Sequence, residues 1–380
     1  MKKIIIYLST LILMLFSLTI SAKQSDGADD AYSKGNYAEA FKLAQPLAAQ
    51  GNARAQALLG EMYLNGEGVK QDSKIAANWF RKAAVQGDVL SQIMLGSMYS
   101  DGDGVPKDDK LAAEWLFKAA VQGDPDAQFE LGVMYYGGLG VIQDYKTAIG
   151  WFRKAAVQGN MNGQINLAKA YVTGNGVHQD YKQALGWLKK AVDQGSSLAQ
   201  VLLGDMYLHG RGVTQDYKLA MEWYLKSATQ GDSIGQANLG AIYYDGLGVT
   251  QDYKLASMWF KKSAAQGDEV GQYNLAQMYR DGKGVPQDYN QAFEWYKKSA
   301  AGGYANAQAA LGAMYGSGLG VKKDMVRAHM WINLAAANGD EKALKVRNTN
   351  SYFTEMTQSQ ISQAQKMASE CEKRSYKNCD

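Results

Sequence analysis

The stretch DPDAQFELGVMYYGGLGVIQDYKTAIGWFRKAAVQG, residues 124–159, decides the fold. In its first half, apolar side chains recur at steps of three and four residues, which predicts one stripe of a helix. These side chains are Ala127, Leu131, Met134 and Tyr135. Asp124 precedes the stripe and suits an N-cap, because its carboxylate can accept a hydrogen bond from a free amide of the first turn. The glycine-rich run at residues 138–141 ends this helix.

A second helix is predicted after the glycine-rich run. Asp144 caps it, and Gly159 ends it in the left-handed conformation that glycine readily adopts. The buried face of this helix is predicted to contain Ala148, Trp151, Phe152, Ala155 and Ala156. The stretch therefore predicts one unit of helix, loop, helix and turn.

This unit is repeated along the chain. All the tryptophans lie 36 residues apart, at Trp79, Trp115, Trp151, Trp187, Trp223, Trp259, Trp295 and Trp331. Eight complete units run from Asn52 to Gly339 without an insertion, and the position of Asp124 is Asn, Asp or Ser in each except the eighth, which has Tyr304. One helix pair cannot bury its own apolar face, whereas stacked copies can. The sequence therefore predicts an all-α solenoid.

The pattern A-x-x-x-L-G-x-x-Y-x-x-G-x-G-V-x-x-D-x-x-x-A-x-x-W-x-x-x-A-A-x-x-G resembles the Sel1-like repeat family, which is related to the tetratricopeptide repeat but has a longer loop. The departures are small: Ala168 and Ala276 replace the glycine of Leu-Gly, and Met325 replaces the tyrosine after the loop aspartate. The resemblance implies a right-handed α/α superhelix whose first helices line the concave face. It also implies a Gram-negative bacterial source and a role in holding other macromolecules.

The flanking segments are predicted to be caps. Residues 23–51 resemble a shorter tetratricopeptide-type unit, and residues 340–380 are predicted to form capping helices and a tail. The run Thr357-Gln358-Ser359-Gln360 is typical of a capping box that opens the last helix. In an exported protein the pair Cys371 and Cys379 favours one disulfide that closes the tail, with free thiols as the alternative.

The first 22 residues are predicted to be a signal peptide. Lys2 and Lys3 precede an apolar run, and small residues lead to cleavage near Ala22, so we expect a periplasmic or secreted protein. An uncleaved anchor is the alternative. No other long apolar segment exists, so no integral membrane segment is expected after cleavage.

The overall charge gives no reason to expect an anionic partner. Of the 40 basic side chains two lie in the signal peptide, so the mature chain has 38 basic and 37 acidic side chains. This balance does not favour nucleic acid or an anionic membrane as the partner.

Motifs that would support catalysis are incomplete in this sequence. The repeated Gly-x-Gly-Val loop lacks the preceding strand and the further glycine or lysine of a phosphate-binding loop. His178, His209 and His329 lie in different units without zinc-ligand spacing. A cysteine-rich subset of the family is associated with β-lactam binding, but its disulfide in each repeat is missing here, and so is any Ser-x-x-Lys. We therefore expect a non-enzyme without a cofactor or metal site.

The partner-binding surface is predicted on the first helices, at positions that vary between units. The candidates are Phe129, Val133, Tyr136, Ile165, Lys169, Asp205, Leu208, Tyr244, Tyr273 and Arg280. Aromatic and arginine anchors of this kind dominate protein recognition. The alternative, which applies most to Ile165 and Val201, is that the side chain packs inside the solenoid.

The function expected from these features is a non-enzymatic scaffold or adaptor that binds a protein or peptide on its concave face. Three alternatives stay open. The chain could be an inhibitor or immunity protein against a toxin or hydrolase, it could bind cell-wall glycan on exposed tyrosines, or it could interact with β-lactams.

Overall fold

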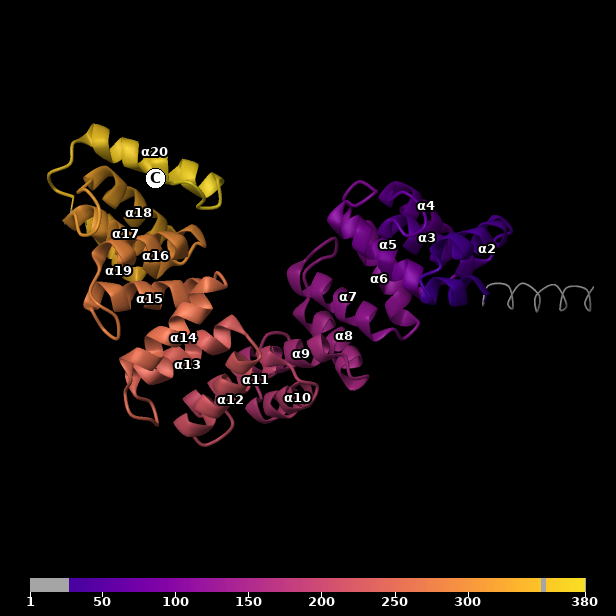
Figure 1. Ribbon diagram of the computed structural model, residues 1–380, viewed down its shortest axis with the longest axis horizontal. Helices are drawn as coiled ribbons and strands as arrows, with labels where there is room; N and C mark the ends of the chain where they lie inside the picture. The colour runs from indigo at the N-terminus through magenta and orange to yellow at the C-terminus, as the bar shows by residue number, and fades with distance from the viewer. Residues whose placement is uncertain (1–26, 350–352, 380) are drawn as a thin grey trace, which may run out of the picture. The chain divides into compact units, whose positions relative to one another are not determined.

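The computed structural model describes residues 27–349 and 353–379 (Figure 1). In these ranges the chain forms helices, turns and loops and no strand. The predicted signal peptide, residues 1–22, lies outside the described residues. The chain is thus an all-helical, tetratricopeptide-like solenoid, which confirms the predicted fold class.

Each repeat contributes two helices of 13 residues. The first helices are α3 (Ala53–Asn65), α5 (Val89–Asp101), α7 (Pro125–Gly137), α9 (Met161–Thr173), α11 (Ser197–His209), α13 (Ser233–Asp245), α15 (Glu269–Asp281) and α17 (Ala305–Ser317). The second helices are α4 (Ser73–Val85), α6 (Asp109–Val121), α8 (Tyr145–Val157), α10 (Tyr181–Asp193), α12 (Tyr217–Thr229), α14 (Tyr253–Ala265), α16 (Tyr289–Ala301) and α18 (Met325–Ala337). Residues 27–33 and α2 (Tyr37–Ala49) precede the repeats, and α19 (Glu341–Thr349) and α20 (Gln358–Lys373) follow them.

The predicted helix caps are present. Asp124 accepts a hydrogen bond from the backbone amide of Ala127 at 2.8 Å, and Asp144 accepts one from Thr147 at 3.1 Å. Gly159 has a φ of 95°, so a side chain there would be strained. Tyr304 makes no side-chain cap hydrogen bond, as its residue type predicts.

The two helices of a repeat approach closely because one of them lacks a side chain at the crossing point. In the third repeat a Cβ atom added to Gly132 would lie 2.6 Å from the ring of Phe152, well inside contact distance. Phe152 is 2% exposed. The glycine of the Leu-Gly pair therefore makes room for the aromatic ring of the second helix.

Neighbouring repeats are joined by buried glutamines. Gln128 donates to the carbonyl of Ala120 at 3.1 Å and accepts from Gln158 at 2.9 Å. The bond to a carbonyl of the preceding segment recurs at Gln56, Gln92, Gln164, Gln236, Gln272 and Gln308. Within single repeats the side-chain pair recurs as Gln86 with Gln56, Gln122 with Gln92, Gln230 with Gln200, Gln266 with Gln236, and Asn338 with Gln308. Each glutamine thus adds a second hydrogen bond to a helix-end carbonyl that already accepts one from a backbone amide, as Ala120 does from Gly123, and so ties its repeat to the one before it.

The prediction that Trp151 is buried is wrong. Trp151 is half-buried at the edge of the core, while its neighbour Phe152 fills the interior. The ammonium of Lys154 lies 3.8 Å from the centroid of the Trp151 ring. Trp331, at 2% exposure, is covered in the last repeat, where Leu334 replaces the lysine.

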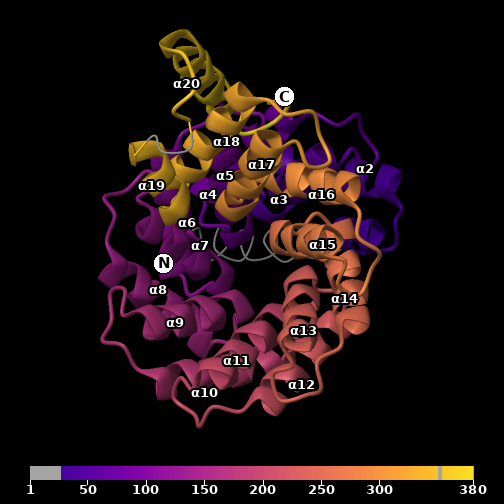
Figure 2. The same cartoon turned by 90° about the vertical axis from the view of Figure 1, so that its left-hand side faces the viewer.

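The described residues divide into two compact units, one up to residue 190 and one from residue 191 onward. In the first unit α3 contacts α5 directly, and in the second unit α13 contacts both α11 and α15. Contacts between second helices of neighbouring repeats are weaker among the described residues. First helices therefore lie on the inner side of the local curve, as Figure 2 shows for α11, α13 and α15 relative to α12 and α14.

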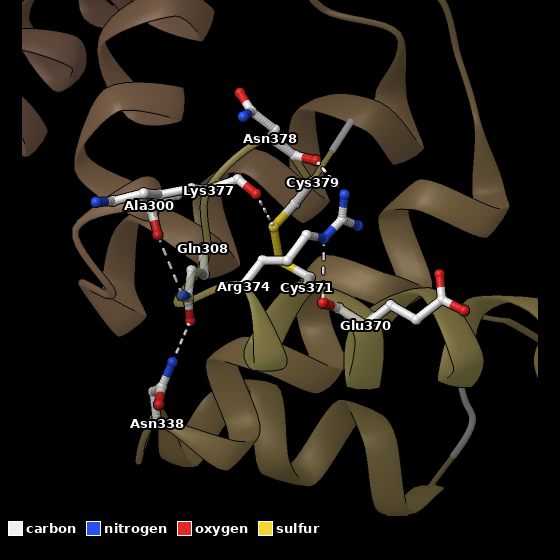
Figure 3. Close-up of a disulfide and its surroundings, with 9 residues drawn as sticks. All are labelled: Ala300, Gln308, Asn338, Glu370, Cys371, Arg374, Lys377, Asn378 and Cys379. Atoms are coloured by element: carbon white, nitrogen blue, oxygen red, sulfur yellow. Dashed lines mark hydrogen bonds between the residues drawn. A yellow bond between two sulfur atoms is a disulfide. The ribbon is translucent and has the colours of Figure 1, made fainter.

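The C-terminal tail is closed and tied to the last repeat. Cys371 and Cys379 form a disulfide, which Figure 3 shows beside Arg374. The Tyr376 hydroxyl donates to the Asn338 side chain at 2.8 Å, and Asn338 in turn donates to a glutamine of α17 at 2.9 Å. The capping box at Thr357 is also present. No described helix is long and apolar enough to span a membrane.

Candidate functional site

The ten predicted contact residues fall into two groups, one in each unit. In the first unit, Tyr136 is 36% exposed and Lys169 is exposed, whereas Phe129 and Val133 are half-buried. In the second unit the remaining five are all half-buried: Asp205, Leu208, Tyr244, Tyr273 and Arg280. A half-buried side chain is oriented by its neighbours in the fold and is still accessible to a partner.

Ile165 does not belong to this surface, because it is only 4% exposed. It occupies the same repeat position as Val201, which packs in one core cluster with Tyr224 of its own second helix. A short aliphatic side chain at this position stays under the second helix. Phe129 and Tyr273, at the same position in other repeats, are longer and remain partly exposed.

In the first unit the surface centres on Tyr136. Its ring contacts Tyr145 with centroids 4.8 Å apart, and it lies 6.3 Å from the buried ring of Phe152. Asn175, from the loop of the next repeat, donates to the Tyr136 hydroxyl at 3.1 Å. The ring is therefore fixed in orientation before any partner arrives.

In the second unit the equivalent residue is Tyr244. Its ring lies 5.2 Å from Tyr253, and the ammonium of Lys283 donates to its hydroxyl at 2.8 Å. The same ammonium lies 4.8 Å from the Tyr244 ring centroid, so it stays at the hydroxyl end of the ring. Hydrogen bonding to Tyr244 raises the pKa of Lys283, which therefore stays charged.

Tyr273 is held between two other tyrosines. Its ring lies 5.6 Å from Tyr296 and 5.2 Å from Tyr304, and its hydroxyl accepts a hydrogen bond from Gln277 at 2.8 Å. Burial raises the pKa of Tyr273, so the hydroxyl stays protonated. Tyr304, whose side chain does not cap its helix, packs here against the ring of Tyr273.

Arg280 carries the charge of this region. Its guanidinium donates to both carboxylate oxygens of Asp281, at 2.7 and 3.0 Å. This pairing raises the pKa of Arg280 and lowers that of Asp281. The arginine is therefore oriented by its neighbour through two parallel hydrogen bonds.

A cavity of about 500 Å³ opens beside Tyr273 and Arg280. Its lining combines small or aliphatic side chains with polar and charged ones. The remaining lining residues are Asn306, Ala309, Ala310, Ile332, Gly339, Asp340, Glu341, Lys342, Ala343 and Val346. The alanines of α17 provide the space, because no bulky side chain of the eighth repeat fills it. This cavity lies beside two of the predicted contact residues, Tyr273 and Arg280.

Asp205 has an internal partner. It accepts a hydrogen bond from the Tyr224 hydroxyl at 2.6 Å, and burial raises its pKa above its ordinary value. Removing this bond would leave a buried hydroxyl unpaired. Asp205 therefore contributes to packing within its repeat as well as to the surface beside Leu208.

Two kinds of contributor were missed from the sequence. The first is the residue between the glycines of the Gly-x-Gly loop, where Asn175 and Lys283 each reach a tyrosine of the preceding repeat. This position varies between otherwise regular loops, which was a usable signal. The second is the cap residue Lys342, whose place at the cavity depends on how α19 folds back.

The described residues hold no group of three or more His, Cys, Asp or Glu side chains that could bind a metal ion. His178 is exposed, with its Nδ1 2.9 Å from the carbonyl of Gln179. His329 is 4% exposed and lies 3.0 Å from the amide of Asn333.

Comparison with known protein families identifies the repeat. The Sel1 repeat model matches the chain nine times, at residues 25–52, 53–88, 89–124, 125–160, 162–196, 197–232, 233–268, 270–304 and 305–340. The first match falls on the segment that resembled a tetratricopeptide-type cap. A search of curated proteins gives no match.

Two solved structures are similar over most of the chain. The first is c5321, a protective antigen present in uropathogenic Escherichia coli strains that displays an SLR fold. It is 37% identical with a TM-score of 0.76, over 94% of this chain and 78% of the antigen. The second is a Sel1 repeat protein from Oxalobacter formigenes, 33% identical with a TM-score of 0.64, over 82% of this chain and 90% of that protein. With nine repeat matches and these relatives, the chain belongs to the Sel1 repeat family.

Proposed function

We propose that this protein is an exported, non-enzymatic scaffold that holds a protein or peptide partner on the first helices of its second unit. The observation that carries the proposal is the cavity of about 500 Å³ with Tyr273 and Arg280 on its wall. A recess lined by aliphatic side chains and an oriented arginine can receive one anchoring side chain of a partner. Sel1 repeat proteins are generally non-catalytic scaffolds, which agrees with this role.

The geometry of the tyrosines favours a protein over a glycan. A sugar ring stacks on an open aromatic face, but Tyr244 packs against Tyr253 with Lys283 at its hydroxyl, and Tyr273 lies between two other rings. The hydroxyls of both tyrosines are already hydrogen-bonded. What is accessible is ring edge and aliphatic surface, which suits apolar side chains of a partner.

Export is part of the proposal and is supported by two features. Residues 1–22 have the order of a signal peptide, and Cys371 and Cys379 form a disulfide in the tail. Disulfides persist in oxidising compartments such as the periplasm and the extracellular space.

Site-specific photo-crosslinking tests the proposed binding face. A benzophenone side chain would be placed singly at Tyr244 or Tyr273, and for comparison at Lys218 or Lys254 on the second helices α12 and α14. Illumination of producing cells should give protease-sensitive adducts of defined mass from the two tyrosine positions. The two lysine positions should give little or none.

Two results would count against the proposal. One is a set of adducts of equal yield from both faces, because contact would then be unspecific. The other is adducts that resist protease and are digested by a peptidoglycan hydrolase, because the partner would then be a glycan.

A further inference from the structure

The charges of the first unit are sorted between the two layers of helices. The second helices α4, α6 and α8 carry eight basic and two acidic side chains, whereas the first helices α3, α5 and α7 carry one basic and four acidic. The basic side chains are Lys74, Arg81, Lys82, Lys110, Lys118, Lys146, Arg153 and Lys154. The near-neutral total charge therefore conceals a basic face.

These basic side chains are not neutralised by carboxylates. None of the eight forms an ion pair within the described residues. Three of the lysines lie instead over tryptophan rings, at 3.9 Å for Lys82, 3.8 Å for Lys118 and 3.8 Å for Lys154. A ring attracts an ammonium without cancelling its charge, so the positive potential remains at the surface.

Exposed valines lie one helical turn beyond the three lysines. Val85, Val121 and Val157 are 72%, 57% and 71% exposed. We call these three valines together with Lys82, Lys118 and Lys154 the lysine–valine edge.

The edge is continuous because consecutive helix ends are joined. Gln122 donates to the carbonyl of Gly87 at 3.2 Å, and Gln158 donates to that of Gly123 at 2.9 Å. The rings of Phe117 on α6 and Trp151 on α8 also touch, with centroids 6.1 Å apart. Phe117 is itself 47% exposed.

The valines are peculiar to the first unit. In the second unit lysines still cover the tryptophans, with Lys226, Lys262 and Lys298 at 3.9 to 4.2 Å. The positions equivalent to the valines are occupied there by Thr229, Ala265 and Ala301. The repeat fold therefore does not require an exposed valine at this position.

We propose that the lysine–valine edge docks on the surface of a bilayer that contains anionic phospholipids. Lysines beside such a surface are attracted by the negative headgroups. Half-exposed tryptophans prefer the level of the headgroups, and the valines can enter the boundary of the acyl chains. A soluble polyanion would satisfy the lysines but would leave the valines in water, so the valines favour the bilayer.

This inference departs from the electrostatic argument made from composition. That argument used the total charge, which is close to zero, whereas a surface responds to the charge it faces. The proposed contact is peripheral, and it leaves the first helices of the unit uncovered.

Vesicle co-sedimentation of the mature, disulfide-bonded protein tests the proposal. Vesicles of phosphatidylcholine alone would be compared with vesicles that contain phosphatidylglycerol in roughly equal amount. The wild type should bind the mixed vesicles only. Raising the salt from about 0.1 M to about 1 M should release it, because the Debye length falls from ~10 to ~3 Å.

Matched triple variants locate the contact. Lys82→Gln, Lys118→Gln and Lys154→Gln together should weaken binding roughly a hundredfold, since each lysine near an anionic surface contributes about a factor of five. The control, Lys226→Gln, Lys262→Gln and Lys298→Gln, removes the same charge from the same tryptophan partners and should change binding less than about threefold. Val85→Ser, Val121→Ser and Val157→Ser together should weaken binding roughly tenfold without changing the charge.

Three results would overturn the proposal. The first is no binding of the wild type to mixed vesicles at about 0.1 M salt. The second is an equal loss in the two lysine triple variants, which would show unspecific attraction. The third is vesicle binding by the valine variant that equals that of the wild type, together with displacement of both proteins from the vesicles by heparin. This result would assign the edge to the binding of acidic polymers. Circular dichroism melting would confirm that every variant is folded.

Discussion

Truncation of two adjacent aromatic residues distinguishes the core of a repeat from its edge. Phe152 fills the space left by Gly132, whereas Trp151 lies half-buried under Lys154. The tryptophan is the most regular landmark of the sequence, so its position suggests that it matters most for stability. The structure predicts the reverse order: Phe152→Ala should destabilise more than Trp151→Ala.

The magnitudes follow from burial. A buried phenylalanine costs ~3–5 kcal/mol to truncate, and the upper part of this range is expected because Gly132 has no side chain that could fill the cavity. Half of a tryptophan side chain corresponds to ~100 Å² of buried area and, at ~25 cal/mol per Å², to about 2.5 kcal/mol. We therefore expect Phe152→Ala to exceed Trp151→Ala by about 1–2 kcal/mol.

The assay must resolve local unfolding, because each repeat contacts only its neighbours and damage spreads outward from its origin. Urea unfolding followed by circular dichroism gives the global change. Hydrogen exchange of the amides of α7, α8 and α9 gives the local one. A Trp151→Ala loss equal to or larger than that of Phe152→Ala would refute the assignment of Phe152 as the core residue.

Three further predictions concern the cap and buried titratable groups. The double variant Cys371→Ser, Cys379→Ser should lose at most ~2.5 kcal/mol of unfolding free energy, because the disulfide closes a short loop. Hydrogen exchange should become faster only in the tail and at the end of α20. Faster exchange throughout α17 would contradict this. Burial lowers the pKa of His329 below 6.5, so the unfolded chain binds a proton more readily than the folded chain, and stability should fall as the pH drops below about 6.5. If the stability of a His329→Gln variant depends on pH in the same way, His329 is not the cause. Burial raises the pKa of Asp205 above 3.8, so above this pH the folded chain binds more protons than the unfolded chain, and stability should fall as the pH rises. Asp205→Asn should flatten this dependence of stability on pH, and an unchanged slope would contradict the assignment.

Much of the fold could be predicted from the sequence because one period governs it. The glycines, caps and apolar stripes recur every 36 residues, so the assignment of one unit is tested by every other unit. The caps of Asp124 and Asp144 were predictable because their type and spacing fix their chemistry. Even the exception, Tyr304, was visible as a residue that cannot cap.

The side on which an aromatic residue lies was less predictable. Trp151 and Phe152 are adjacent and both apolar, so a stripe of apolar residues does not tell which one reaches the centre. A lysine three residues after every tryptophan except Trp331, such as Lys154, was the signal that the ring faces solvent. Total charge was similarly uninformative, because it sums over both layers of helices.

The candidate site was only partly predictable. Tyr136, Tyr244 and Arg280 are accessible as expected, but Ile165 is too short to extend beyond the second helix. The cavity beside Tyr273 depends on the packing of α19 against α18, which no repeat pattern describes. Contacts made by a cap that departs from the repeat require the three-dimensional structure.

The central claim is that the inner surface around Arg280 binds a protein partner, and one titration tests it most directly. The partner recovered by crosslinking would be titrated calorimetrically with the mature protein, with Arg280→Ala, and with Lys254→Ala on the outer helix α14. Arg280 is the sharper probe than the half-buried Tyr273, because a surface ion pair contributes only ~0–1 kcal/mol to stability. We predict that Arg280→Ala weakens binding about thirtyfold, as an interface anchor worth ~2 kcal/mol should, while its melting temperature and the affinity of Lys254→Ala stay unchanged. Wild-type affinity in Arg280→Ala together with weakened binding in Lys254→Ala would contradict the account, because the partner would then lie on the outer face.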